Sequence, residues 1–336
     1  MAEKQNEAST AQAEVLPLVL GKRQSRFKRT LKECKRHSLL LVMAGFVLVW
    51  YFIFLYGPMY GLLMAFKDFS FRKGVFGSSW KTDRHGNLDL FANFTRMFKD
   101  HAFLRAFRNT FIISGLKLLV GFPVPIIFAL LLNEIRNRRY KKLVQTVSYL
   151  PYFISWIVLS GIMRQILNLE SGLYGYLVRY LGFPEINFLT YRPTFRGLLT
   201  VSSIWRNFGW SSIIYLAALG GIDGQLYEAA EIDGAGRWKK AIHITLPGLA
   251  PVIVIQLILQ VGTIVGDDFN QIFNLYSVPV YEVADVIGTY TYRQSFQDST
   301  DFSYSTAVGL MQNTLSFVLI IITNWITSKF SEYGIW

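Results

Sequence analysis

Polar residues recur at helical spacing in two strongly apolar stretches of this sequence. The first set starts within the stretch 247–265 and ends just after it. Its four residues are separated by steps of four, three and four: Gln256, Gln260, Thr263 and Asp267. Four others in 305–327 lie at steps of three, four and three: Thr306, Gly309, Asn313 and Ser316. At this spacing each set forms a polar stripe along one face of a helix. A polar stripe within the hydrocarbon of a membrane is costly in free energy unless it faces protein or water. Each stripe alone fits hydrogen bonding between helices as well as the lining of a hydrophilic pathway, but two consecutive stripes favour the pathway.

Two cations lie near the middles of other apolar stretches, where inserting a charge costs about 2.5–3.5 kcal/mol. They are Lys117 and Arg206, and the neighbours of Arg206 are aromatic or amide side chains: Trp205, Asn207, Phe208 and Trp210. Aromatic faces combined with planar polar groups suit a sugar ring. Acidic residues within the apolar stretches are too few to pair both cations, since Asp267 and Asp268 fall at the end of one stretch. Either a cation lines a pathway for an anionic saccharide, or backbone carbonyls, a buried ion pair or a partner subunit satisfy both cations.

The sequence contains none of the residue patterns that would indicate catalysis. It has no glycine-rich phosphate loop followed by Lys and Ser or Thr, and neither Gly-x-Ser-x-Gly nor His-Glu-x-x-His occurs. The four histidines lie in separate segments, and a single cysteine, Cys34, excludes an internal disulfide and a multi-cysteine metal site. We therefore expect a non-catalytic chain without catalytic residues, metal ligands or a bound cofactor of its own.

The stretch 228–247, EAAEIDGAGRWKKAIHITLP, is the longest conspicuous polar interruption late in the chain. Asp223 is placed to cap a short helix, and Gly234 is placed to end it. Pro247 suits the first turn of the next helix. Exposed alanines make a poor core face but let another protein's backbone approach, and Glu228 offers that protein a charge. The stretch indicates a docking helix, although an ordinary connector between two helices has the same local features.

The composition is that of a membrane protein. Of the 336 residues, 52% are apolar and 17% are charged, whereas soluble proteins carry about 25% charged residues. Six apolar stretches are long enough to cross a bilayer as helices: 39–63, 106–132, 143–166, 197–219, 247–265 and 305–327. Gly121, Pro123 and Pro125 predict a kink or break in the second. The predicted fold class is all-α, a polytopic membrane protein with six transmembrane helices.

The distribution of charge predicts how these helices are oriented. The net charge is +12, and much of it lies just before the first apolar stretch, between Lys22 and Arg36. Because Lys and Arg concentrate on the cytoplasmic side, we interpret 1–38 as a basic cytoplasmic tail rather than a signal peptide or a nucleic-acid-binding segment. Residues 39–327 then form the membrane domain, with a cytoplasmic loop at 220–246. An even number of spans also places the tail 328–336 in the cytoplasm.

The stretch 228–247 resembles the EAA loop of importer permeases of the ATP-binding-cassette (ABC) class. That pattern is Glu-Ala-Ala, three residues, Gly, nine residues, then Ile-x-Leu-Pro. It is met here without a gap by Glu228, Ala229, Ala230, Gly234, Ile244, Leu246 and Pro247. Other stretches, among them YGPMYGLLMAFKDF and LLNEIRNRRYKKLVQTVSYLPYFISW, are similar to a carbohydrate branch of this class that takes up oligosaccharides or polysaccharide fragments and includes the alginate importer. Gly224 is a departure, since the family often has Pro after Asp223.

The resemblance implies a multi-pass permease of the bacterial cytoplasmic (inner) membrane that works in a complex. Its implied partners are a second permease, two copies of a cytosolic ATPase that binds ATP and Mg, an extracytoplasmic solute-binding protein, the saccharide and membrane lipid. No nucleic acid is expected. The helix at Glu228 is implied to sit in a cleft of the ATPase, and the candidate docking residues are Glu228, Ala229, Ala230, Asp233 and Gly234.

The expected function is that of the membrane-spanning subunit of an ATP-driven saccharide importer. The candidate pathway residues are Lys117, Trp205, Arg206, Asn207, Gln256, Gln260, Thr263 and Asn313. If a cation lines the pathway, the saccharide is acidic, such as a uronate oligomer. The alternative is a secondary sugar transporter driven by an ion gradient, which needs acidic residues in the membrane, and only Asp267 and Asp268 are candidates. The lack of paired catalytic groups disfavours an intramembrane enzyme.

Overall fold

The computed structural model describes residues 36–83, 85–266, 269–297 and 300–330. The chain divides into two compact units, Met1–Tyr60 and Gly61–Trp336, each of which is considered by itself. Within the described residues, extended pairing is limited to two isolated bridges, between Lys67 and Trp80 and between Thr82 and Leu88. The regular structure is otherwise helical, which confirms the prediction of an all-α chain.

The first apolar stretch is helical from α2 (Ser38–Tyr51) through the π turn η1 (Phe52–Tyr56) and the 3-10 helix η2 (Gly57–Phe66). Together these residues, Ser38–Phe66, are long and apolar enough to cross a membrane. Pro58 has no N–H to donate, so regular α-helical hydrogen bonding cannot continue through it. No residue of α2 is buried, and its uniformly apolar surface therefore suits lipid or another subunit.

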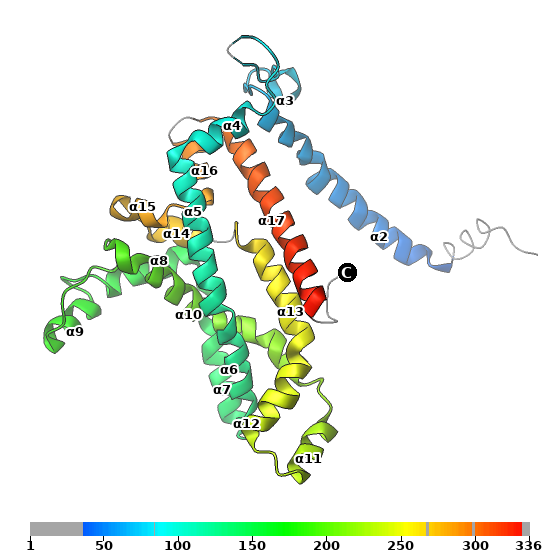
Figure 1. Ribbon diagram of the computed structural model, residues 1–336, viewed down its shortest axis with the longest axis vertical. Helices are drawn as coiled ribbons and strands as arrows, with labels where there is room; N and C mark the ends of the chain where they lie inside the picture. The colour runs from blue at the N-terminus through cyan, green and yellow to red at the C-terminus, as the bar shows by residue number, and fades with distance from the viewer. Residues whose placement is uncertain (1–35, 84, 267–268, 298–299, 331–336) are drawn as a thin grey trace, which may run out of the picture. The chain divides into compact units, whose positions relative to one another are not determined.

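In the second unit, the stretch His101–Asn133 is a single long helical segment made of α5 (His101–Leu116), the π turn η3 (Lys117–Gly121) and α6 (Pro123–Asn133) (Figure 1). The Asp100 carboxylate caps its start by accepting a hydrogen bond from the Ala102 N–H at 2.8 Å. The disruption predicted at Gly121 and Pro123 takes the mild form of this π turn. A π turn directly before a proline accommodates the missing donor without ending the helix.

The third apolar stretch, 143–166, is bent rather than straight, so it is either a broken span or a re-entrant segment. The structure has α7 (Arg138–Tyr149) and η4 (Leu150–Phe153) on one side of a 99° bend and α8 (Trp156–Ile166) on the other. Pro151 removes a backbone donor at the bend, and Ile154 and Ser155 adopt extended backbone. The Ser155 hydroxyl then caps α8 by accepting from the Val158 N–H at 3.3 Å.

The number of spans is only partly settled by length and composition. Four helical stretches of the described residues are apolar and long enough to cross a membrane, and the bent pair is a fifth candidate. The remaining predicted stretch, 197–219, lies in α10 (Arg192–Leu219), whose 28 residues extend about 42 Å. α10 is long enough to span a bilayer but is more polar than the other four. Six spans therefore stay a prediction.

The docking stretch forms α11 (Gly224–Ile232) and leads into a continuous helix made of α12 (Arg237–Lys240), the π turn η5 (Ala241–Thr245) and α13 (Leu246–Thr263). The fifth span was expected to begin at Pro247, but the helix starts at Arg237, since Pro247 only occupies the first turn of α13 within it. α13 packs beside α17 (Phe302–Phe330), and α10 packs beside α6 (Figure 1).

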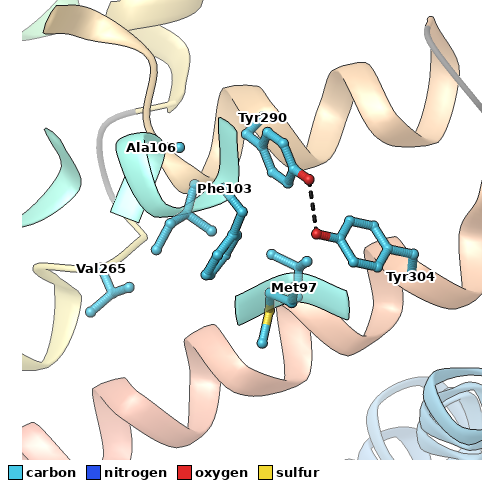
Figure 2. Packing of buried hydrophobic residues seen from close by; sticks show 8 residues of the cluster. Met97, Phe103, Ala106, Val265, Tyr290 and Tyr304 are labelled. Atoms are coloured by element: carbon cyan, nitrogen blue, oxygen red, sulfur yellow. Dashed lines mark hydrogen bonds between the residues drawn. The ribbon is translucent and has the colours of Figure 1, made fainter. Parts of the chain in front are cut away.

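Short helices fill the segments expected outside the membrane: α3 (Gly74–Gly77), α4 (Ala92–Lys99), α9 (Leu173–Leu181), α14 (Phe269–Leu275), η6 (Val278–Val280), α15 (Tyr281–Ala284) and α16 (Ile287–Phe296). Figure 2 shows the core that joins α4 and α5 to α16 and α17, in which Met97 and Phe103 are fully buried. The Tyr290 and Tyr304 hydroxyls lie 2.9 Å apart across it. This core fixes the start of α5 relative to the start of α17.

Candidate functional site

A cavity of about 870 Å³ opens between η3, α10, α13 and the bend before α8. Six of the eight predicted pathway residues line it: Lys117, Arg206, Asn207, Gln256, Gln260 and Thr263. They come from three segments that are far apart in the sequence. The described lining therefore combines two cations with amides, hydroxyls and aromatic rings.

Arg206 is held at the bend between η4 and α8. Its Nε donates to the Ile154 carbonyl and one Nη to the Tyr152 carbonyl, both at 3.0 Å, while the other Nη donates to Asn207 Oδ1 at 3.1 Å. The guanidinium also lies 5.1 Å from the centre of the Trp156 ring. Backbone carbonyls released by the bend are thus the acceptors, so Arg206 braces the bend and also places its charge at the cavity.

Lys117 lies at the first residue of the π turn η3, and its ammonium donates a hydrogen bond to Gln271 Oε1. The Gln271 side chain is almost fully buried, and its Nε2 donates to the Leu199 carbonyl at 2.7 Å and to Ser202 Oγ at 2.9 Å. Lys117, α14 and α10 are therefore joined through one amide. A change in the position of Lys117 would be transmitted to both helices.

The aromatic lining of the cavity contains one stacked pair. The rings of Tyr152 and Trp210 are nearly parallel, with centroids 4.6 Å apart. Phe208 meets Phe128 edge-on with centroids 5.0 Å apart. Flat ring faces beside cations and amides can receive the apolar face of a sugar while the polar groups bind its hydroxyls or carboxylates.

The docking helix α11 is closed at both ends by hydrogen bonds. The Asp223 carboxylate caps its start by accepting from the Gln225 N–H at 2.9 Å. At the other end Gly234 has φ +73°, its N–H donates to the Glu231 carbonyl, and the Ala235 N–H donates to the Ala230 carbonyl. These two bonds form a Schellman motif, which requires a left-handed residue and explains the glycine. The predictions of the cap and of the ending glycine are confirmed.

α11 presents its surface to the outside of the chain. None of its residues is buried, and its last residue, Ile232, is 88% exposed. Trp238 of the following helix α12 is 78% exposed. An ion pair at 2.8 Å joins Glu231 to Lys240, and the hydrogen bond from Lys240 lowers the pKa of Glu231. The Tyr227 hydroxyl lies 3.0 Å from Thr245 Oγ1, which ties α11 to the base of α13. Because α11 is exposed and is hydrogen-bonded to the residue that precedes α13, a displacement of α11 can be transmitted to α13.

Residues 121–332 match the family of binding-protein-dependent transport system inner membrane components. This chain belongs to that family. It is therefore a permease subunit of an ABC importer, a non-catalytic membrane component that binds no cofactor itself. The resemblance stated from the EAA loop is confirmed.

The alignments with known proteins extend over almost the whole permease. It is 38% identical to the polygalacturonan/rhamnogalacturonan transport system permease protein YteP of Bacillus subtilis (strain 168), over 97% of this chain and 98% of the relative. Protein LplB of the same organism is also 38% identical, over 88% of this chain and 90% of the LplB chain. A solved chain from a bacterial alginate ABC transporter, in complex with an alginate pentasaccharide-bound periplasmic protein, is 37% identical with a TM-score of 0.81, covering 91% of this chain and 100% of that one.

Two predicted pathway residues of the permease do not reach the cavity. Trp205 is 47% exposed and lies about 100° around α10 from Arg206, on the side away from the cavity lining. Asn313 is exposed on α17, because the neighbouring Gln312 faces α13 and donates to the Val265 carbonyl at 2.8 Å. The second polar stripe therefore does not line this cavity, whereas the described part of the first does. Asp267 and Asp268 lie outside the described residues.

Gln271 was not among the predicted pathway residues, because it lies beyond the apolar stretch 247–265. Its spacing was informative, since residue 271 continues the steps of the stripe at 256, 260, 263 and 267. The helix itself does not continue: α13 ends at Thr263 and α14 begins at Phe269. A re-entering short helix brings Gln271 back against α10, which periodicity alone does not reveal.

Proposed function

We propose that this permease imports an acidic oligosaccharide, such as a uronate oligomer, which an extracytoplasmic solute-binding protein delivers to it. It works as one half of a heterodimer with a second permease, and two copies of a cytosolic ATPase bind ATP and Mg for the pair. The cavity between η3, α10 and α13 forms part of the saccharide pathway.

The observation that carries this proposal is the lining of that cavity. Lys117 and Arg206 supply positive charge from two different helices, and Gln256 and Gln260 supply amides along one face of α13. The stacked Tyr152 and Trp210 rings add flat apolar surface at the same place. Carboxylates, hydroxyls and the apolar face of a pyranose ring each find a matching group there.

The substrates named for the relatives support an acidic saccharide. One relative is described as a polygalacturonan/rhamnogalacturonan permease, and two solved structures belong to importers of alginate, which one of them describes as an acidic polysaccharide. Galacturonate and alginate units both carry a carboxylate on a pyranose ring. A cationic and aromatic lining is suited to either.

The coupling of ATP use to transport rests on α11. Its exposed residues Glu228 and Ala229 form the surface that enters a cleft of the ATPase, with Ala230, Asp233 and Gly234 holding the helix in shape. ATP binding draws the ATPases together, and the contact between Tyr227 and Thr245 passes that motion to α13. The pathway then opens towards the binding protein, and hydrolysis returns it to the inward-facing state.

The test is ATP hydrolysis by the reconstituted complex, stimulated by binding protein loaded with either a uronate oligomer or a neutral oligosaccharide of equal length. We expect the uronate oligomer to stimulate more strongly, and we expect Lys117→Gln to reduce that preference while Lys117→Arg keeps it. Arg206→Gln provides a second test of the charge. Equal stimulation by both saccharides, or an unchanged preference in both glutamine variants, would contradict the acidic substrate.

A further inference from the structure

A second cavity, of about 550 Å³, lies where the start of α5 meets α15 and the start of α10. Three arginines, a histidine, a leucine and a single carboxylate line it: His101, Leu104, Arg105, Arg108, Arg192 and Glu282. His101, Arg105 and Arg108 lie at steps of four and three residues, so they share one face of α5. The cavity is strongly cationic.

The single carboxylate is already engaged. Glu282 forms an ion pair with Arg192, whose Nε also donates to the Pro279 carbonyl at 2.9 Å. The Nε of Arg105 is buried and makes no hydrogen bond to any residue that the structure describes. A buried guanidinium donor without an acceptor is costly, and a carboxylate is the acceptor that an arginine fork fits best.

The position of the cluster is unusual for a membrane protein. It lies at the ends of α5 and α10 opposite to the docking helix, which in the proposed topology is the outer side. Lys and Arg are normally depleted from the outer ends of spans, so an arginine cluster there runs against the usual bias.

The second cavity is separate from the saccharide cavity. The two share no lining residue, and a fully buried apolar cluster around Ile113, Phe195 and Leu199 occupies α5 and α10 between them. Beside the second cavity, the Asn109 amide donates to the Glu282 and Asp285 carbonyls, both at 3.0 Å, and so links α5 to α15. Because the two cavities are separated by packed residues, a ligand of the second cavity need not be the transported saccharide.

We propose that this arginine cavity receives carboxylate side chains on the surface of the solute-binding protein and so forms part of its docking site. The inference rests on the proposed function, in which such a protein delivers the saccharide. Arginines whose charges are partly desolvated and held on helices are effective anchors at protein interfaces. Their charge also speeds the encounter with an acidic partner surface.

The experiment titrates saccharide-loaded binding protein against the reconstituted permease–ATPase complex and measures ATP hydrolysis. We expect Arg105→Gln and Arg108→Gln each to raise the half-saturating concentration of binding protein by roughly tenfold and to weaken its dependence on salt. Glu282→Gln removes the only carboxylate of the lining and should lower that concentration. Arg72→Gln is the matched control, because Arg72 is an exposed arginine of the outer region that is not part of this cavity.

Three outcomes would overturn the inference. In the first, the Arg105 and Arg108 variants behave like Arg72→Gln. In the second, they raise the half-saturating concentration of free saccharide at saturating binding protein, which would assign the cavity to the substrate. In the third, the effect occurs only in anionic vesicles and not in zwitterionic ones, which would assign it to lipid headgroups. If binding protein fails to stimulate even the unmodified complex, the proposed function fails instead.

Discussion

Gly234 ends α11 because the Schellman motif needs a residue at φ +73°, a backbone conformation that costs a residue with a side chain about 1–2 kcal/mol. Gly236, two residues later, has φ −67°. A Cβ at either position would meet no atom within 4 Å. The two glycines therefore differ in backbone conformation but not in available space.

This difference gives a matched pair of variants. We expect Gly234→Ala to shift or loosen the end of α11 and to lower stimulated ATP hydrolysis severalfold, while Gly236→Ala leaves it near the unmodified rate. Gly234→Asn should lie between them, because asparagine tolerates the left-handed conformation better than alanine. Hydrolysis by the reconstituted complex at equal amounts of inserted permease is the measurement. If the two alanine variants have equal effects, backbone conformation at Gly234 is unimportant for coupling.

Single residues also show how far the sequence alone could lead. The cap at Asp223 and the left-handed Gly234 follow from local rules of helix ends, and both predictions are confirmed. The charge of Arg206 could be noticed in the sequence, but its acceptors lie on another helix, at Tyr152 and Ile154. Trp205 was grouped with Arg206 by adjacency, although neighbours in a helix point in directions about 100° apart.

At the scale of elements, the bend between η4 and α8 is stabilised from outside by α10. The bend frees the carbonyls of Tyr152 and Ile154 from helical hydrogen bonding, and the Arg206 guanidinium donates a hydrogen bond to each of them. A fully buried carbonyl that loses its donor costs about 1–3 kcal/mol, and the cost is smaller for half-buried residues such as these two. The bent helix and the arginine therefore depend on each other.

We predict that Arg206→Leu lowers the thermal stability of the purified permease, because both carbonyls lose their donor and no group of leucine replaces it. Arg206→Lys should be intermediate, since an ammonium reaches fewer acceptors than a guanidinium fork. Trp205→Leu serves as the control in the adjacent, exposed position and should change stability little. An Arg206→Leu variant as stable as the Trp205→Leu variant would mean that the bend does not need this arginine.

The length of each apolar segment was enough to identify the candidate spans, but it did not distinguish a straight span from a broken one. Pro151 was visible in the sequence, and so were Pro123 and Pro125, yet only the first accompanies a 99° bend. In the second stretch a π turn before Pro123 keeps the helix continuous. The outcome at each proline depends on which neighbouring groups satisfy the backbone, and this information lies elsewhere in the fold.

At the scale of the whole molecule, many apolar side chains of the described helices are exposed. The most apolar part of Ser38–Phe66 buries none of its residues, and that of Phe302–Lys329 buries only 11%. Lipid covers part of such surface, and the proposed second permease covers another part. The membrane composition of the sequence predicted this exposure in general, while the assignment of faces to lipid or subunit needs the partner.

The topology also makes a prediction for the whole chain. If the number of spans is six, tags fused before Met1 and after Trp336 should both be protected from protease added to intact cells and become accessible after lysis. A tag placed in the segment 85–90 should be cut in intact cells and serves as the positive control. Cleavage of only one terminal tag in intact cells would indicate an odd number of spans.

The exposure of α11 also bears on how this sequence is free to change. Glu228 and Ala229 contribute little to the folding of their own chain, since no residue of α11 is buried. In the proposed complex, natural selection on these two positions acts through the ATPase and hardly through the permease's own stability. Mutations there should be compensated by changes in another gene. By contrast, drift at Gly234 is limited by the backbone of this chain itself.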